Sequence, residues 1–210
     1  MKDILFNKDF TCVAVSKTKP IEEIQKIYDL GHRDFGENKV QELEHKYHNL
    51  PKDINWHMIG HLQSNKVKKV VPIVSLIHSI DSLKLLKVVN KESKKINKVT
   101  NCLIQINISK ESTKFGFNEG EIDFLDKSFL KDYQNIKIIG LMGMASFSND
   151  EILVKSEFEN LYKIYSNMKN SIGDLNILSM GMSSDYKLAV DAGSNMVRIG
   201  SKIFGARNYQ

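Results

Sequence analysis

Short strand-like runs alternate with amphipathic stretches along the whole chain. The runs contain many β-branched residues, and we expect strands at residues 11–16, 33–35, 55–59, 73–80, 100–108, 136–141, 175–178 and 196–199. Apolar residues at helical spacing predict helices at 21–30, 39–47, 64–70, 82–95, 119–130, 150–168 and 183–192, with a final turn from Ser201. A strand followed by a helix, repeated in this way, predicts an α/β protein with a single (β/α)8 TIM-type barrel.

An open, doubly wound parallel sheet is the alternative architecture. It would more often carry a glycine-rich phosphate loop after its first strand, where this chain has Ser16-Lys17-Thr18. No linker, low-complexity segment or internal repeat marks a second domain. We therefore expect residues 1–210 to form one domain.

Composition changes this picture little and excludes several classes of protein. Hydrophobic and charged fractions of 41% and 26% are those of an ordinary globular protein. The N-terminus is too poor in apolar residues for a signal peptide, and no apolar run is long enough to span a membrane. Cys12 and Cys102 lie singly in apolar runs, as core cysteines do. We expect a cytoplasmic protein without membrane contact.

The net charge of +5 comes mainly from lysines spread over helix faces. The arginines are Arg33, Arg198 and Arg207 only, and no run of like charges appears. A nucleic-acid surface would be more clustered and richer in arginine. We therefore expect no nucleic-acid partner.

Candidate chemistry lies at the carboxyl ends of the predicted strands, where barrels of this kind place their sites. The first strand stops at Lys17, and Pro20 then opens the next helix. A desolvated lysine amine at that place is suited to forming an imine with a carbonyl. The alternative is that Lys17 simply extends from the strand end to the surface.

The loops after the seventh and eighth strands resemble each other. Ser183 in one, and Gly200 with Ser201 in the other, place small or hydroxyl-bearing residues at a helix start. Such loops present N–H and O–H donors to an anion, and these two loops form the usual phosphate site of (β/α)8 barrels. Plain helix capping by Ser183 and Ser201 is the alternative interpretation.

Arg198 lies within the eighth strand, between Val197 and Ile199. A buried guanidinium needs an acceptor, either a carboxylate or a ring nitrogen of a heteroaromatic cofactor. In a closed barrel Lys17, Arg198 and the two loops are neighbours. A phosphorylated pyridine with an aldehyde group, pyridoxal 5′-phosphate (PLP), would span all three.

Several motifs together resemble the pyridoxal phosphate homeostasis protein family (the YggS/PROSC proteins), which is related to the barrel domain of alanine racemase. The resemblance runs from about Cys12 to Arg207 and rests on the segments 14–20, 35–38 with 41–42, 56–66, 179–185 and 198–205. The resemblance implies PLP bound as a lysine imine (Schiff base), with no established reaction. The implied cofactor-binding residues are Lys17, Asn38, Ser183, Arg198, Gly200 and Ser201. About ten residues precede the first strand, where the family usually has a helix, so the barrel floor is expected to be less covered.

Two classes of function remain at this point. The first is a non-catalytic PLP-binding protein that buffers the cofactor or delivers it to apo forms of PLP-dependent enzymes. The second is a racemase-like enzyme. Alanine racemase takes a second acid or base from a further domain, whereas this chain ends at Gln210, soon after the barrel closes. Arg198 against the ring nitrogen would also weaken the cofactor as an electron sink. We therefore expect a carrier with no catalytic residues, and a monomer.

Three further residues could contribute to a site. His57 and His61 are four residues apart, but they span a strand end and a loop and have no acidic or thiol partner nearby in the sequence, so no metal site is expected. Lys114 lies in the loop after the fifth strand, where it could approach the barrel mouth or remain solvated.

Overall fold

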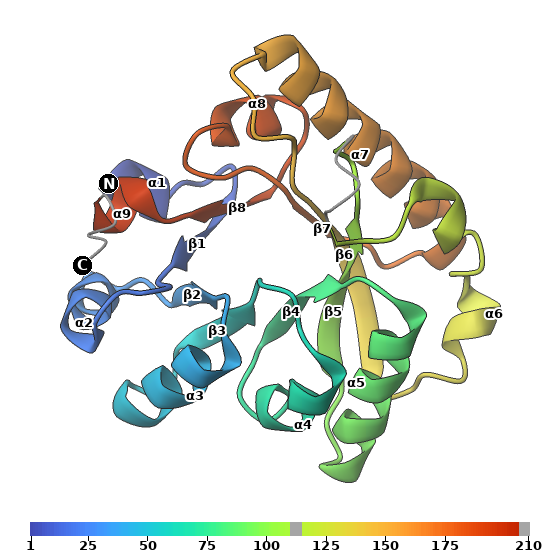
Figure 1. Cartoon of the computed structure of the whole chain (residues 1–210), viewed down its shortest axis with the longest axis horizontal. Helices are drawn as coiled ribbons and strands as arrows, with labels where there is room; N and C mark the ends of the chain where they lie inside the picture. The colour runs from blue at the N-terminus through green and yellow to red at the C-terminus, as the bar shows by residue number, and fades with distance from the viewer. Residues whose placement is uncertain (110–114, 206–210) are drawn as a thin grey trace.

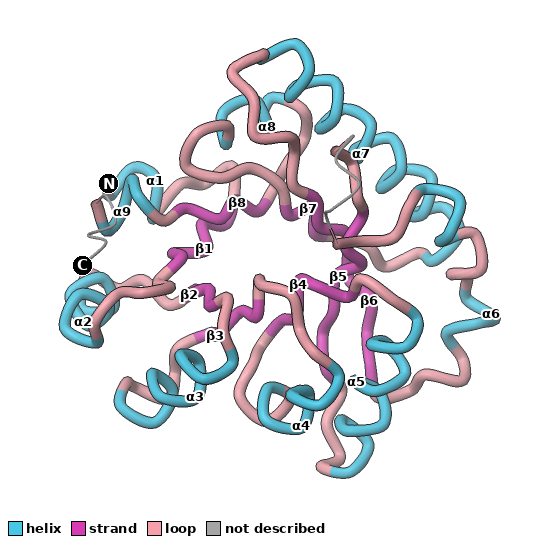
Figure 2. The backbone as a smooth tube through the Cα atoms, in the orientation of Figure 1, coloured by secondary structure: helices cyan, strands magenta, loops and turns pink. Residues whose placement is uncertain are grey.

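The structure is a computed structural model, which describes residues 1–109 and 115–205. Its strands form a closed parallel barrel in which each strand pairs with the next and β8 pairs with β1. Figure 2 shows the ring of strands with the helices outside it. The strands are β1 (Thr11–Val15), β2 (Asp34–Glu37), β3 (Asn55–Met58), β4 (Leu76–Ile80), β5 (Thr100–Ile106), β6 (Ile136–Gly143), β7 (Ile177–Ser179) and β8 (Met196–Ile199). The predicted (β/α)8 barrel is confirmed.

Helices follow the strands as the sequence pattern predicts (Figure 1). They are α1 (Lys2–Leu5), α2 (Ile21–Asp29), α3 (Val40–Asn49), α4 (Val67–Val70), α5 (Leu83–Lys95), α6 (Lys127–Leu130), α7 (Glu151–Ile172), α8 (Tyr186–Asp191) and α9 (Ser201–Phe204), with 3-10 turns η1 (Ser64–Lys66) and η2 (Glu119–Ile122). Among the described residues, no helix combines the length and apolar character that a membrane crossing requires.

The predicted helices differ in extent at several places: the segment 64–70 divides into η1 and α4, and α7 continues to Ile172. The helix expected at 119–130 is wrong: the segment contains η2 and the short α6 instead. A capping box between Asn118 and Glu121 begins the first turn, and the Asp126 side chain accepts the Phe129 N–H to begin the second. The helix expected from residue 183 begins at Tyr186, because the Asp185 carboxylate accepts the Met182 N–H and closes a turn before it.

The N-terminal segment contains one structural element that the sequence pattern did not predict. Residues 2–5 form the single helical turn α1, and Leu5 is buried in the main hydrophobic core. Cys12 and Cys102 are both buried and free, as expected for core cysteines. Burial raises the pKa of the Cys12 thiol to about 12.

Alternation along the strands separates two hydrophobic layers. The larger layer lies between barrel and helices and includes Val197 and Ile199, whereas Met196 belongs to a smaller cluster in which residues of non-adjacent strands meet. Successive strand residues point to opposite faces, so Arg198 shares the interior face with Met196. The fold therefore directs the Arg198 side chain into the barrel.

Candidate functional site

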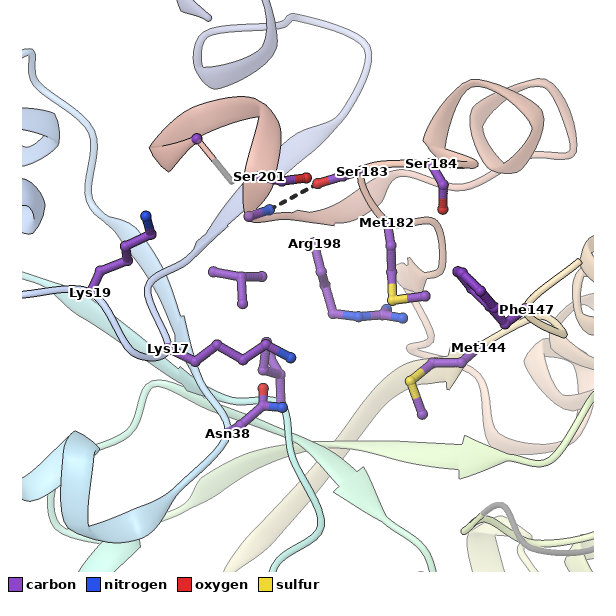
Figure 3. A pocket seen from close by; sticks show the side chains of 14 residues that line it. Lys17, Lys19, Asn38, Met144, Phe147, Met182, Ser183, Ser184, Arg198 and Ser201 are labelled. Carbon is purple, nitrogen blue, oxygen red and sulfur yellow. Dashed lines mark hydrogen bonds between the residues drawn. The ribbon is translucent and has the colours of Figure 1, made fainter. Parts of the chain in front are cut away.

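A cavity of about 480 Å³ lies at the carboxyl ends of the strands. It receives residues from the ends of β1, β2 and β8 and from the loops after β3, β6 and β7. The structure places all the residues proposed from the sequence on its wall, namely Lys17, Asn38, Ser183, Arg198, Gly200 and Ser201. Figure 3 shows Lys17 and Asn38 on one side of the cavity, Met144, Phe147 and Met182 on the other, and Arg198 between them.

The residues on either side of Lys17 are held by one buried charged cluster, Glu37, Glu42 and Lys46. Lys46 Nζ donates to the Ser16 carbonyl at 2.8 Å, to Glu37 at 2.6 Å and to Glu42 at 3.0 Å. Glu42 also accepts the backbone N–H of Thr18 at 2.7 Å, and Thr18 has a positive φ of 63°. The lysine at the end of β1 is therefore fixed through its neighbours in the sequence.

Burial and hydrogen bonding shift the pKa values of the two carboxyls in this cluster in opposite directions. The Glu37 side chain is fully buried, and its burial raises the pKa of the carboxyl even though Lys46 opposes the rise. Burial also acts on Glu42, but the Thr18 N–H and Lys46 outweigh it and hold the pKa of that carboxyl below its ordinary value. Sequence reasoning did not assign Lys46. The available signal was a lysine three residues after Leu43, on the apolar face of its helix.

Arg198 is buried without a carboxylate partner among the described residues. Its Nη1 donates to the Ser179 carbonyl at 2.8 Å and to the Ser179 hydroxyl at 2.7 Å, and its Nη2 donates to the Gly143 carbonyl at 3.0 Å. Burial lowers the pKa of the guanidinium to about 10. A guanidinium has five N–H groups, so two of them have no acceptor in the described chain. Of the two interpretations made from the sequence, a carboxylate acceptor is therefore wrong for the described residues.

Ser183 joins the loops after β7 and β8. Its Oγ accepts the Gly200 N–H at 3.2 Å, which Figure 3 marks with a dashed line. Helix capping, the alternative role for the two serines, does not occur: α8 begins after Asp185, and no side chain caps α9. Because Ser183 Oγ accepts from Gly200, the hydroxyl hydrogen stays available to donate to a ligand.

The mouth of the cavity has an apolar side that sequence reasoning missed. Met144, Phe147 and Met182 line it, and the Phe147 side chain is 96% exposed. The Glu157 carboxylate holds the preceding residue by accepting the Ser146 N–H and hydroxyl, each at 2.7 Å. The sequence signal for this rim was a phenylalanine, Phe147, in the loop after the sixth strand.

The remaining candidates lie apart from the cavity. His61 Nδ1 contacts Asp81 at 2.6 Å, whereas the ring of His57 contacts Asp34 and His78. Within residues 1–109 and 115–205, no group of three or more potential ligands could hold a metal ion. Lys114 lies outside the described residues.

Comparison with known proteins gives concordant matches. The sequence matches the family described as "Alanine racemase, N-terminal domain" over residues 1–208. A pyridoxal phosphate homeostasis protein from Pasteurella multocida is 38% identical over 204 residues, covering 94% of this chain and 86% of that protein. The protein of the same name from Schizosaccharomyces pombe is 39% identical over 198 residues, covering 93% and 83%.

Solved structures agree with these matches. PipY from Synechococcus elongatus, with PLP bound, has a TM-score of 0.85 at 30% identity and covers 95% of this chain and 94% of its own. An alanine racemase from Clostridium difficile has a TM-score of 0.79 at 16% identity, covering 99% of this chain and 55% of the racemase. The likeness to the racemase shows the fold alone.

Fold and cavity together define a class of protein: a parallel (β/α)8 barrel whose mouth places a strand-end lysine near an arginine carried by the last strand. Within that class, the chain belongs to the pyridoxal phosphate homeostasis protein family.

Proposed function

We propose that this chain binds PLP in the cavity at the barrel mouth and takes part in PLP homeostasis by buffering or delivering the cofactor. The observation that carries the proposal is the meeting of Lys17, Arg198 and the Ser183–Gly200 pair at one cavity. These residues come from the turn after β1, from β8 and the residue that follows it, and from the loop after β7, and β8 lies between the other two strands in the barrel. Relatives named for PLP homeostasis and the PLP-bound structure of PipY support it.

Each residue of the cavity has a role that its chemistry suits. The Lys17 amine would hold PLP covalently, by condensing with its aldehyde and releasing one water molecule. Arg198 offers its two remaining N–H groups to the ring nitrogen. Ser183, Gly200 and Ser201 bind the phosphate, and Asn38 contacts the edge of the ring. A buried cation surrounded only by uncharged partners also suits an anionic ligand.

The lining of the cavity favours a carrier over a catalyst. Its titratable residues in the described chain are Lys17, Lys19 and Arg198, with no carboxylate, histidine, cysteine or tyrosine among them. Lys19 Nζ donates to the Phe204 carbonyl at 2.8 Å. Racemisation needs an acid on the face opposite the imine lysine, and Arg198 at the ring nitrogen would leave the ring a weak electron sink. The apo forms of PLP-dependent enzymes are therefore the proposed recipients.

Absence of efficient turnover is the first expected result. Each missing general acid or base typically lowers a rate by about 10²–10⁴. Incubation of the PLP-loaded protein with a panel of L- and D-amino acids, followed by chiral analysis and carbon dioxide measurement, should therefore show no turnover near 1–10³ s⁻¹, about the usual range for enzymes. In parallel, the loaded protein should restore activity to an apo PLP-dependent enzyme. Turnover within that range for any amino acid would refute the carrier function.

A second expected result concerns the phosphate. Replacing Ser183 and Ser201 together by alanine should weaken PLP binding by about 1–3 kcal/mol for each charge-assisted hydrogen bond that is lost. Binding of unphosphorylated pyridoxal should change far less. Titration calorimetry with both ligands measures the difference. Ser184→Ala is the matched control, since Ser184 lines the same cavity beside Ser183 and is not assigned to the phosphate. Equal losses for both ligands would place the phosphate elsewhere.

A further inference from the structure

A continuous chain of hydrogen bonds crosses the barrel interior from Arg198 to Asp34. Arg198 Nη1 donates to the Ser179 hydroxyl at 2.7 Å, and that hydroxyl lies 3.1 Å from His78 Nδ1. His78 Nε2 lies 2.9 Å from His57 Nδ1, and His57 Nε2 lies 3.2 Å from Asp34 Oδ1. We call this chain of four residues the relay: Ser179, His78, His57 and Asp34. At its Ser179 end, the relay reaches the cavity of Figure 3 through Arg198.

The relay joins the two ends of the barrel. Asp34 is the first residue of β2, so it lies at the end of the strand away from the cavity, whereas Ser179 is the last residue of β7. The contact between His78 and Ser179 links β4 to β7, which are not neighbours in the barrel, and therefore passes through its interior. None of these contacts was expected from the sequence, and the proposed function uses only their last member, Arg198.

With both rings neutral, hydrogen-bonding chemistry gives the relay one direction. A guanidinium only donates and a carboxylate only accepts. If Ser179 accepts from Arg198, its own hydrogen is directed to His78 Nδ1, and His78 must then carry its hydrogen on Nε2. That hydrogen is donated to His57 Nδ1, so His57 also carries its hydrogen on Nε2 and donates it to Asp34. Each of the four contacts then holds one hydrogen, and both histidines have the same tautomer.

The surroundings favour a neutral His78 inside the barrel and an ionised Asp34 at its end. His78 is fully buried, and burial together with His57 and Arg198 lowers the pKa of its ring well below the ordinary value. At the other end the Asp34 side chain is 29% exposed. Burial opposes ionisation of Asp34, but His57, His32 and Asn55 together outweigh it and hold the pKa of the carboxyl below its usual range. His32 and Asn55 are the other polar side chains that face Asp34.

We propose that the relay positions Arg198 and thereby sets the hydrogen-bonding state of the ligand group that Arg198 meets in the cavity. The relay residues are positioning residues, since none of them lines the cavity. The inference rests on the proposed function in one respect, namely that this ligand group is the ring nitrogen of PLP.

The physical effect is a fixed orientation of the guanidinium. The Ser179 hydroxyl turns its hydrogen toward His78, which leaves its lone pairs to accept from Arg198. With Nη1 held by Ser179 and one hydrogen of Nη2 held by Gly143, the two remaining N–H groups are left for the ligand. An arginine held as a donor keeps the ring nitrogen an acceptor, and therefore unprotonated. The charge at Asp34 thus acts on the opposite end of the barrel.

The first test uses the protein without PLP. Histidine labelled with ¹⁵N allows long-range ¹H–¹⁵N correlation spectra to assign each tautomer at pH 7. We expect His57 and His78 as neutral rings protonated on Nε2. The Nδ1-protonated tautomer, or a positively charged ring, at either residue would overturn the relay.

The second test removes the charge at the far end. Asp34→Asn keeps the size of the side chain, and it should alter the histidine signals and weaken PLP binding on the order of fivefold, the low end of usual coupling between sites. With PLP labelled by ¹⁵N in the ring, the ring signal should shift toward the protonated form. Asp81→Asn is the matched control, because Asp81 also bonds a histidine, His61, outside the relay; it should leave the ring signal and the affinity unchanged.

A second variant keeps the proposal testable if Asp34→Asn does not fold. Ser179→Ala cuts the relay beside Arg198 and should shift the ring signal in the same direction as Asp34→Asn. If folded Asp34→Asn gives the same PLP-ring and histidine signals as the unaltered protein, the proposal is overturned. Failure of the unaltered protein to take up PLP would refute the proposed function instead, and the histidine tautomers would still decide whether the relay exists.

Discussion

Replacing Lys17 by alanine should abolish the visible absorbance of the PLP-loaded protein. The absorbance arises from the imine, and Lys17 is the cavity amine that the buried cluster of Glu37, Glu42 and Lys46 holds through its two neighbours. The serines proposed to bind the phosphate remain in the variant, so weak non-covalent binding of PLP should persist without the colour. Absorbance spectra of the purified protein after incubation with PLP measure this effect directly.

Lys19→Ala is the control for this prediction. Lys19 lines the same cavity two residues later, but its Nζ donates to the Phe204 carbonyl and lies 3.5 Å from Glu23. The Lys19 variant should therefore keep the absorbance. Borohydride reduction followed by peptide mapping identifies the modified residue. A label on Lys19 or Lys114, with an unchanged spectrum in Lys17→Ala, would contradict the assignment.

Replacing Lys46 by methionine should cause a large loss of stability. The Lys46 and Glu37 side chains are 5% and 0% exposed, so the variant leaves a buried carboxylate without its cation. Removal of one partner of a buried ion pair typically costs about 3–5 kcal/mol in the free energy of unfolding. Urea unfolding followed by circular dichroism measures the change. The loop that carries Lys17 should also loosen, since the Ser16 carbonyl loses its donor.

Two comparisons make this prediction specific. Lys69→Met breaks the more exposed pair with Glu44 and should cost only about 0–1 kcal/mol. The penalty in Lys46→Met should also shrink as pH falls. The pKa of Glu37 is already raised by burial in the intact protein, and a carboxyl with a raised folded-state pKa loses stability as pH rises through that value. A pH-independent penalty, or one equal to that of Lys69→Met, would show that Glu37 is not the cause.

Much of the barrel and its mouth could be predicted because local rules determine them. Alternation of strand and helix patterns gives a (β/α)8 barrel, and chain order then brings β1 beside β8. Lys17 at the end of one strand and Arg198 on another are therefore near each other in any barrel with these boundaries. The six residues proposed for the site all reach one cavity for this reason.

Contacts that depend on exact side-chain placement could not be predicted in this way. His78 and Ser179 are 101 residues apart, and they meet only because the closed barrel brings residues of the non-adjacent strands β4 and β7 together in its interior. The prediction of one helix at 119–130 was wrong for a different reason. The apolar spacing suits a helix, but Asp126 caps a new helix in the middle of the segment. Local hydrogen bonds of polar side chains outweighed the periodicity there.

The unsatisfied N–H groups of Arg198 link the amount of folded protein to the supply of its ligand. In the described chain this buried guanidinium hydrogen-bonds only to uncharged partners and keeps two N–H groups without an acceptor, so a ligand that supplies an acceptor there should stabilise the folded barrel. A ligand that binds only the folded state raises stability with its concentration, by about 2.7 kcal/mol at one hundred times the dissociation constant. Within a cell, the lifetime of such a protein against proteolysis would rise and fall with the ligand pool.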